Sequence, residues 1–100
     1  MSFTKALGGR SLNNGIRIIG VNPGPVATDR MLKIMKRKAI GMLDDEARWE
    51  ELYDHYPGKR PATVKEVADL CAFLASPLAG YITGTIVTID GGISARGSVI

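Results

Sequence analysis

Two short apolar runs rich in β-branched side chains constrain the fold of this chain more than any other feature. Residues 16–22 read Ile-Arg-Ile-Ile-Gly-Val-Asn, and residues 85–89 read Thr-Ile-Val-Thr-Ile. Such runs are typical of strands covered on both faces, which belong to parallel sheets. Because a helical pattern separates the two runs, we expect a strand–helix–strand unit with a right-handed parallel crossover. The predicted fold class is therefore α/β.

The helix between the two strands is the clearest in the sequence. Thr63 and Glu66 form a capping box, and a Ser-Pro pair at residues 76–77 ends the segment. An apolar stripe at helical spacing comprises Val64, Val67, Cys71 and Leu74. We therefore expect a helix over residues 63–76, with Cys71 as an inert part of the core.

Another helix is expected before the first strand, at residues 2–13. Its apolar side chains at helical spacing are Phe3, Ala6 and Leu7. Gly8 and Gly9 lie inside it, and each costs about 1 kcal/mol relative to alanine. Glycines at this cost indicate a close packing contact, here with another helix or another subunit.

The segment after the first strand begins with a Pro-Gly-Pro turn at residues 23–25, which ends strand pairing. Thr28 or Asp29 is then placed to cap a helix that begins near Arg30. One or two short helices are expected over residues 30–56.

Charge in that segment falls into two adjacent blocks of opposite sign. Five basic side chains lie within residues 30–38, and six acidic ones lie within residues 44–54. This arrangement favours a solvated helical surface over a nucleic-acid or membrane surface. A solvated acidic face is also a better interpretation of the second block than a metal site.

Two parallel strands do not make a stable sheet by themselves. Parallel sheets are covered by helices on both faces, and an unpaired apolar strand edge is an aggregation liability. The helices at residues 2–13 and 63–76 are patterned to cover opposite faces of something larger. The 100 residues are therefore expected to form one partial domain.

Composition excludes several classes of protein. Cys71 is the only cysteine, so no internal disulfide or cysteine-based zinc site is available, and a reducing cytoplasm is the natural compartment. No apolar run approaches the roughly 20 residues of a membrane-spanning helix. The first residues are not followed by the apolar stretch of a secretory signal.

The turn at residues 22–28, Asn-Pro-Gly-Pro-Val-Ala-Thr, is the strongest candidate for a ligand site. Ligands of open α/β sheets bind beyond the carboxyl ends of the strands, where this turn is expected. The prolines fix the backbone, while Gly24 lets a flat ring approach closely. Thr28 offers a hydroxyl, and the helix start behind it suits phosphate. A rigid turn with no ligand remains the alternative at this point.

The motif is one of a series. The others are Arg60-Pro61, Glu66-Val67-Ala68, Phe73-Leu74-Ala75-Ser76, Tyr81-Ile82-Thr83-Gly84 and Ile89-Asp90-Gly91-Gly92. Together they resemble the last two strands of a short-chain dehydrogenase/reductase, and the resemblance covers nearly the whole chain. It implies the C-terminal part of a Rossmann-like doubly wound parallel sheet, spanning residues 1–100, with a substrate-covering lid at about residues 30–56.

The resemblance also implies roles for individual residues. Pro23 and Gly24 would lie against the nicotinamide ring of NAD or NADP. The backbone of Val26 would bind the carboxamide, and the hydroxyl of Thr28 would reach the carboxamide or the pyrophosphate. Related enzymes reduce carbonyl compounds or oxidise alcohols, and they assemble into dimers or tetramers. A non-catalytic fragment that pairs with itself or with full-length subunits is the alternative function.

No catalytic residue is expected in this chain. The family's glycine-rich fingerprint, its catalytic serine and its Tyr-x-x-x-Lys would precede the first residue. Lys5 is not that lysine, because no tyrosine stands four residues before it. Met1 would then be an internal methionine, a downstream start or the start of a truncated gene. The residue that decides between NAD and NADP would also lie in the preceding part.

Aromatic and sulfur side chains of the lid are candidates for substrate contact. Met31, Tyr53 and Tyr56 could line an apolar substrate pocket, although packing of the lid explains the same residues. His55, the only histidine, is more typical of a surface side chain than of a base or a metal ligand.

Overall fold

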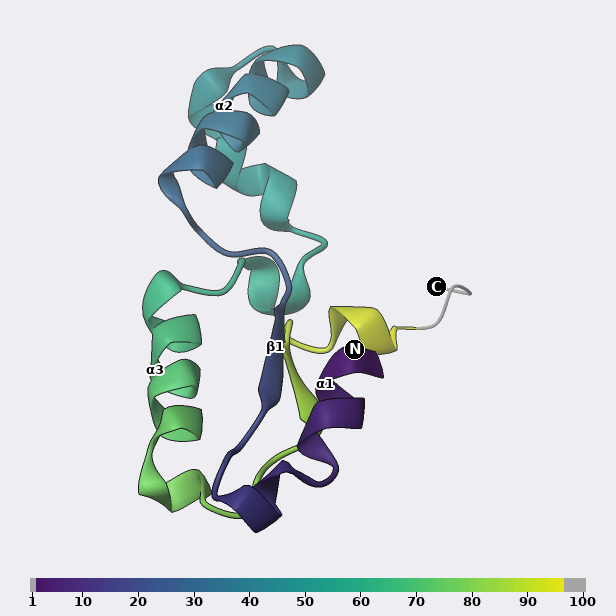
Figure 1. Cartoon of the computed structure of the whole chain (residues 1–100). Coiled ribbons are helices and arrows are strands. Elements are labelled where there is room, and N and C mark those ends of the chain that lie inside the picture. Colours follow the sequence, from purple (N-terminus) through teal and green to yellow (C-terminus); the bar gives the residue numbers. More distant parts are fainter. Residues whose placement is uncertain (1, 97–100) are drawn as a thin grey trace. The chain divides into compact units, whose positions relative to one another are not determined.

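The computed structural model describes residues 2–96 (Figure 1). Its helices and strands follow the order α1 (Ser2–Gly8), β1 (Ile19–Pro23), α2 (Asp29–Leu43), α3 (Val64–Ala75) and β2 (Thr85–Ile89). Five 3-10 turns lie between or after them, at Ser11–Asn14, Glu46–Tyr53, Pro57–Lys59, Pro77–Ala79 and Ile93–Ala95. The predicted order of helix, strand, lid helices, helix and strand is confirmed.

The described residues form two compact units. The first, here called the sheet unit, contains residues 2–23 and 65–89. The second contains residues 24–64 and 90–96 and is called the lid unit, after the segment that the sequence predicts to cover a substrate. No helix among the described residues has the length and apolar character required to cross a membrane.

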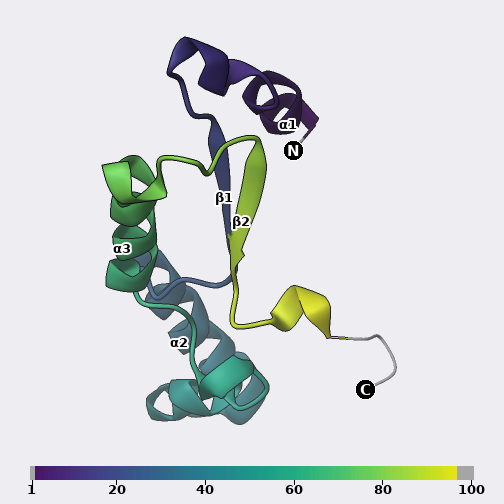
Figure 2. The same ribbon diagram turned by 90° about the horizontal axis from the view of Figure 1, so that it is seen from below.

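Strands β1 and β2 pair in parallel within the sheet unit, as Figure 2 shows, with Ile19 opposite Thr85 and Pro23 opposite Ile89. The strand was expected from residue 16, but regular pairing begins at Ile19. The reason is that Ile18 bonds to the loop before β2: its N–H donates to Thr83 Oγ1 at 3.1 Å, and its carbonyl accepts from the Gly84 N–H at 2.8 Å.

Helices α1 and α3 lie on opposite sides of this strand pair (Figure 1). The alternation of β1 explains this arrangement. Gly20 faces α1, since a side chain there would come within 3.5 Å of Thr4 Oγ1. Ile19 and Val21 face α3, and together with its Leu74 they line a cavity of about 410 Å³.

Two expectations about burial in the sheet unit are wrong. Every residue of β1 and β2 keeps some exposure, whereas strands covered on both faces were expected. Cys71 was expected in the core, but it is exposed. The cause is common to both: the helical stripe and the strands are patterned for more facing layers than the described residues provide.

Helix α1 ends at Gly8, earlier than the expected residue 13. Gly8 is buried, and a Cβ atom there would overlap the backbone of Gly84 and stand 3.0 Å from the Ile18 carbonyl oxygen. The carbonyl of Gly8 also accepts a hydrogen bond from Thr83 Oγ1 at 3.3 Å. The close contact predicted for Gly8 therefore exists, but its partner is the loop before β2, not another helix or subunit.

Helix α2 of the lid unit begins where the sequence predicts. Thr28 is its N-cap, with Oγ1 accepting from the Met31 N–H at 3.2 Å, and Asp44 ends it in the left-handed conformation at φ 55°. The second helical segment, Glu46–Tyr53, is a 3-10 helix whose N-cap is Asp45. The buried side chains Met35, Ala39 and Tyr53 form the core of this unit.

Candidate functional site

The turn that follows β1 is held by the segment before α3. Val26 and Ala62 form an isolated parallel bridge, in which the Ala27 N–H donates to the Ala62 carbonyl at 2.8 Å and the Ala62 N–H donates to the Pro25 carbonyl at 2.9 Å. In such a bridge the N–H of the central residue points to the opposite side. Within the described part of the chain, the Val26 N–H accordingly has no acceptor.

The Thr28 hydroxyl lies two residues further on, at the exposed start of α2. Its oxygen accepts from the Met31 N–H, which leaves the hydroxyl hydrogen available to donate. The Thr28 N–H itself donates to the Val26 carbonyl at 2.8 Å. The turn thus presents two donors close together in sequence, one from the backbone and one from a side chain.

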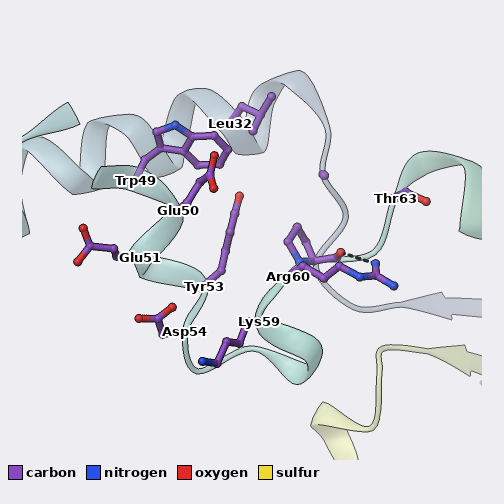
Figure 3. A pocket seen from close by; sticks show the side chains of 11 residues that line it. Leu32, Trp49, Glu50, Glu51, Tyr53, Asp54, Lys59, Arg60 and Thr63 are labelled. Atoms are coloured by element: carbon purple, nitrogen blue, oxygen red, sulfur yellow. Dashed lines mark hydrogen bonds between the residues drawn. The ribbon is translucent and has the colours of Figure 1, made fainter. Parts of the chain in front are cut away.

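A cavity of about 470 Å³ lies within the lid unit (Figure 3). Its apolar wall consists of Ala27, Leu32, Trp49, Tyr53 and Pro61. Polar side chains at its edge are Glu50, Glu51, Asp54, Lys59, Arg60 and Thr63. The volume and the largely apolar wall fall in the range of small-molecule sites.

Tyr53 is the buried polar group of this wall, with only 5% of its surface exposed. Its ring contacts Trp49 edge to face at 5.7 Å between centroids, and contacts Tyr56 at 5.1 Å. The Tyr53 hydroxyl has no hydrogen-bond partner among the described residues. Burial, followed by the proximity of Tyr56 and Glu50, raises the pKa of Tyr53, so the hydroxyl stays protonated and able to donate at neutral pH.

The acidic side chains of the edge differ in their surroundings. Glu51 accepts two hydrogen bonds from Arg48, at 2.6 and 2.9 Å, and these bonds lower the pKa of Glu51. Figure 3 shows Glu51 and Asp54 directed away from the cavity, while Glu50 stands beside Tyr53. Glu50 is also the carboxylate whose charge contributes to the raised pKa of Tyr53.

The predicted site residues fall into two groups. Val26 and Thr28 lie on the turn with their donors available, directly after Pro23 and Gly24 in the chain. Of the predicted substrate residues, Tyr53 lines the cavity. Tyr56 packs on Tyr53 from outside the lining, and Met31 is half-buried near the helix start without lining the cavity.

Sequence reasoning missed two important parts of the cavity wall, Trp49 and Leu32. The sequence contained a signal for Trp49, because it stands four residues before Tyr53, and in the helix expected for residues 30–56 an α-helical spacing of four places two side chains on one face. Leu32 lies in the segment of residues 30–56 where short helices were expected, and no role was predicted for it. The side chain of His55 is exposed, and its backbone carbonyl accepts a hydrogen bond from the Arg96 side chain at 2.7 Å.

Comparison with known proteins identifies the family. The family model described as Enoyl-(Acyl carrier protein) reductase matches residues 1–94. The curated relatives include galactitol 2-dehydrogenase (L-tagatose-forming) of Cereibacter sphaeroides, which is 36% identical over 90 residues. The chain belongs to the short-chain dehydrogenase/reductase family.

Solved structures of short-chain dehydrogenases agree with this assignment. L-sorbose reductase from Gluconobacter frateurii, solved with NADPH and L-sorbose, superposes with a TM-score of 0.80 at 28% identity, covering 96% of this chain and 37% of the other. Levodione reductase superposes with a TM-score of 0.74 at 32% identity, covering 96% of this chain and 36% of the other. The expected Rossmann-like α/β fold is confirmed.

The chain corresponds to part of these relatives. The match to galactitol 2-dehydrogenase includes 90% of this chain but only 32% of that enzyme. The chain therefore spans about a third of the length of the curated relatives it matches. The partly exposed strands of the sheet unit are consistent with that share, because complete parallel sheets are covered by helices on both faces.

Proposed function

We propose that this chain is the cofactor- and substrate-covering C-terminal portion of an NAD(P)-dependent oxidoreductase that acts on an alcohol or carbonyl substrate. The observation that carries the proposal is the pair of available donors after β1, the Val26 N–H and the Thr28 hydroxyl. Both follow the last residue of β1 closely in the chain, and open α/β sheets bind nucleotides beyond the carboxyl ends of their strands.

The residues of the turn suit a nicotinamide group. The Val26 N–H donates to the carboxamide oxygen, and Thr28 donates to the carboxamide or to the pyrophosphate. Pro23 and Gly24 lie against the flat ring, because neither places a long side chain in its way. The free N–H groups at the start of α2 add a positive potential that favours an anion. The bound NAD or NADP supplies the hydride chemistry.

We propose that proton transfer is carried out by a part of the enzyme outside these 100 residues. We infer that the chain by itself is inactive and that the catalytic serine, tyrosine and lysine come from that part. A cytoplasmic site of action, with NAD(P) freely available, fits the single exposed Cys71.

A chimeric enzyme tests the proposal. The segment of galactitol 2-dehydrogenase that precedes its matched region is joined to this chain, and the folded product is assayed for NADH and NADPH binding by cofactor fluorescence. We expect binding in the chimera and oxidation of the cofactor with carbonyl substrates, whereas the isolated chain oxidises neither cofactor. A chimera with a native-like circular dichroism spectrum that binds neither cofactor would contradict the proposal.

Variants of Thr28 separate its two roles within the chimera. Thr28→Asp keeps a good N-cap for α2 but replaces the donor with an anionic acceptor. We expect cofactor affinity to fall at least fivefold, which corresponds to the loss of about 1 kcal/mol for one hydrogen bond. Thr28→Ser keeps both the cap and the donor, so it should bind the cofactor as well as the unchanged chimera.

A non-catalytic assembly role is the second candidate, and two observations favour it. The described sheet contains only β1 and β2, so each strand keeps one unpaired edge. Several large apolar side chains of the sheet unit are exposed, among them Phe3, Leu78 and Tyr81 at 75%, 84% and 91%. These surfaces suit pairing with a second copy or with a full-length subunit, as a dimer or tetramer.

A further inference from the structure

The cavity of the lid unit contains one buried polar group that is not satisfied. Among the described residues the Tyr53 hydroxyl has no hydrogen-bond partner, although only 5% of the residue's surface is exposed. Leaving such a group unpaired costs about 1–3 kcal/mol. Figure 3 shows the hydroxyl end of Tyr53 directed into the space below Leu32 and beside Trp49.

The rest of the wall offers little to a polar ligand. Leu32, Trp49 and Pro61 present carbon atoms, and Arg60 donates to the carbonyl of Pro61 at 3.0 Å. The polar side chains of the lining are exposed at its edge: Glu50, Glu51, Asp54, Lys59, Arg60 and Thr63. In the buried part of the cavity, a polyhydroxylated compound would lose its bonds to water and meet one unpaired polar atom among the described residues, the Tyr53 hydroxyl. A ligand with an apolar body and a single acceptor would give up few hydrogen bonds to water. Its one acceptor would pair with the Tyr53 hydroxyl, so neither polar group would stay buried and unpaired.

Charge at the wall disfavours an anionic ligand. Three of the five charged side chains of the lining are acidic, Glu50, Glu51 and Asp54 against Lys59 and Arg60. Glu50 stands beside Tyr53 (Figure 3), where its carboxylate repels a second negative charge. The Tyr53 oxygen is shielded from solvent, so a neighbouring side chain must move before a ligand can accept a hydrogen bond from it. Glu50 is exposed and can rotate toward solvent, and side-chain changes of this size commonly accompany binding.

We infer that this cavity binds the substrate of the proposed oxidoreductase, and that the substrate is a neutral compound with a ring-sized apolar body and one carbonyl or hydroxyl group. The Tyr53 hydroxyl donates to that oxygen, and Trp49 packs against the apolar body. This inference rests on the proposed function for its link to catalysis. The binding site itself depends only on the residues of the lid unit.

The single tryptophan makes a direct assay available. In the purified chain labelled with ¹⁵N, the Trp49 indole resonance is followed during titration with cyclohexanone, methylcyclohexane and galactitol. Cyclohexanone and methylcyclohexane should shift the resonance with saturation, and galactitol should not. A response to galactitol alone, or to none of the three, would overturn the inference.

Variants assign the contact to Tyr53. Tyr53→Phe should weaken cyclohexanone binding about fivefold or more, the equivalent of about 1 kcal/mol for one hydrogen bond, and leave methylcyclohexane binding unchanged. It should still fold, because the change removes only an unpaired hydroxyl. Tyr56→Phe, a neighbour outside the cavity lining, is the matched control and should bind both compounds normally. Unchanged cyclohexanone affinity in Tyr53→Phe would refute the role of the hydroxyl.

A variant that fills the space tests the location. Leu32→Trp should abolish binding of both apolar probes while the spectrum stays dispersed; retained binding would place the probes elsewhere and contradict the inference.

Failure of the proposed function gives a different result. A chimera that binds no cofactor, with cyclohexanone binding intact in the chain, would reject the oxidoreductase and keep the site. An active chimera in which Tyr53→Phe does not change the KM for cyclohexanone would keep the oxidoreductase and reject the role of this site.

Discussion

Gly8 and Gly84 touch through their backbones, and this contact fixes the end of α1 against the loop that leads into β2. Any Cβ atom at Gly8 would overlap Gly84, whose own φ of 70° is in the region that favours glycine. The neighbouring polar contacts depend on the same approach. Ser11 Oγ and Thr83 Oγ1 lie 3.2 Å apart, and Thr83 also reaches the Gly8 carbonyl.

Gly8→Ala should therefore destabilise the sheet unit. The added methyl group meets backbone that cannot rotate away, and overpacking of this kind costs about 1–3 kcal/mol. Amide hydrogen exchange of residues 85–89 should become faster in the variant. Exchange at the unchanged rate would show that the loop before β2 gives way, and would contradict the contact.

Asp90 is a second residue whose surroundings can be measured. Hydrogen bonds from the side chain of Ser94, from the Ser94 N–H at 3.0 Å and from the Gly92 N–H at 2.8 Å lower the pKa of Asp90 below its ordinary 3.8. A lowered pKa in the folded state means that the ionised carboxylate stabilises the turn above pH 3.8 and that this contribution is lost as the pH falls through the folded-state value.

Ser94→Ala should raise the pKa of Asp90 toward 3.8, because it removes the largest of these bonds. Carbon-13 NMR of the Asp90 carboxyl during an acid titration measures the change. Ser76→Ala serves as the control, since the Ser76 hydroxyl donates to the Phe73 carbonyl and touches no carboxylate. An Asp90 pKa that is equal in the unchanged chain and in Ser94→Ala would argue against the bond.

In helix α2, local capping signals set the two ends, and packing determines which face is buried. Thr28 starts it, Asp44 ends it in a left-handed conformation, and Met35 and Ala39 bury one face four residues apart. Gly41 lies in the last turns of the helix, where a Cβ atom would meet nothing within 4 Å. That glycine has no packing role in the described chain.

Gly41→Ala should stabilise the lid unit by about 0.5–1 kcal/mol, the difference in helix propensity between the two residues. Urea unfolding followed by the fluorescence of Trp49, which lies in the same unit, gives the change directly. Replacement of glycine by alanine is thus expected to lower stability at Gly8 and to raise it at Gly41. A loss of stability at Gly41 would mean that the residue is packed against something.

At the scale of the whole molecule, the apolar surface governs behaviour in solution. The exposed side chains of the sheet unit and the two open strand edges are the features that a complete Rossmann sheet covers. We expect the purified chain to associate as its concentration rises, with weight-average mass above one chain at micromolar concentration in sedimentation velocity. A clean folded monomer under those conditions would count against the assembly role.

The sequence by itself determined the features that depend on near neighbours in the chain. The β-branched runs, the Thr28 cap and the stripe of α3 gave the order of elements, because backbone propensity and capping are local. The helix between the two runs then predicted parallel strands, because a strand–helix–strand crossover joins neighbouring parallel strands. The series of motifs from the turn after β1 to Asp90-Gly91-Gly92 was enough to indicate the family.

Only the tertiary structure decided which side chains face one another. It paired Gly8 with Gly84, left Cys71 exposed, and buried Tyr53 against Trp49 while Met31 stayed outside the cavity. Periodicity names the face of an element that is apolar, but burial also requires a second element opposite that face. The partner of each face is set by contacts between residues far apart in the sequence, which no local pattern contains.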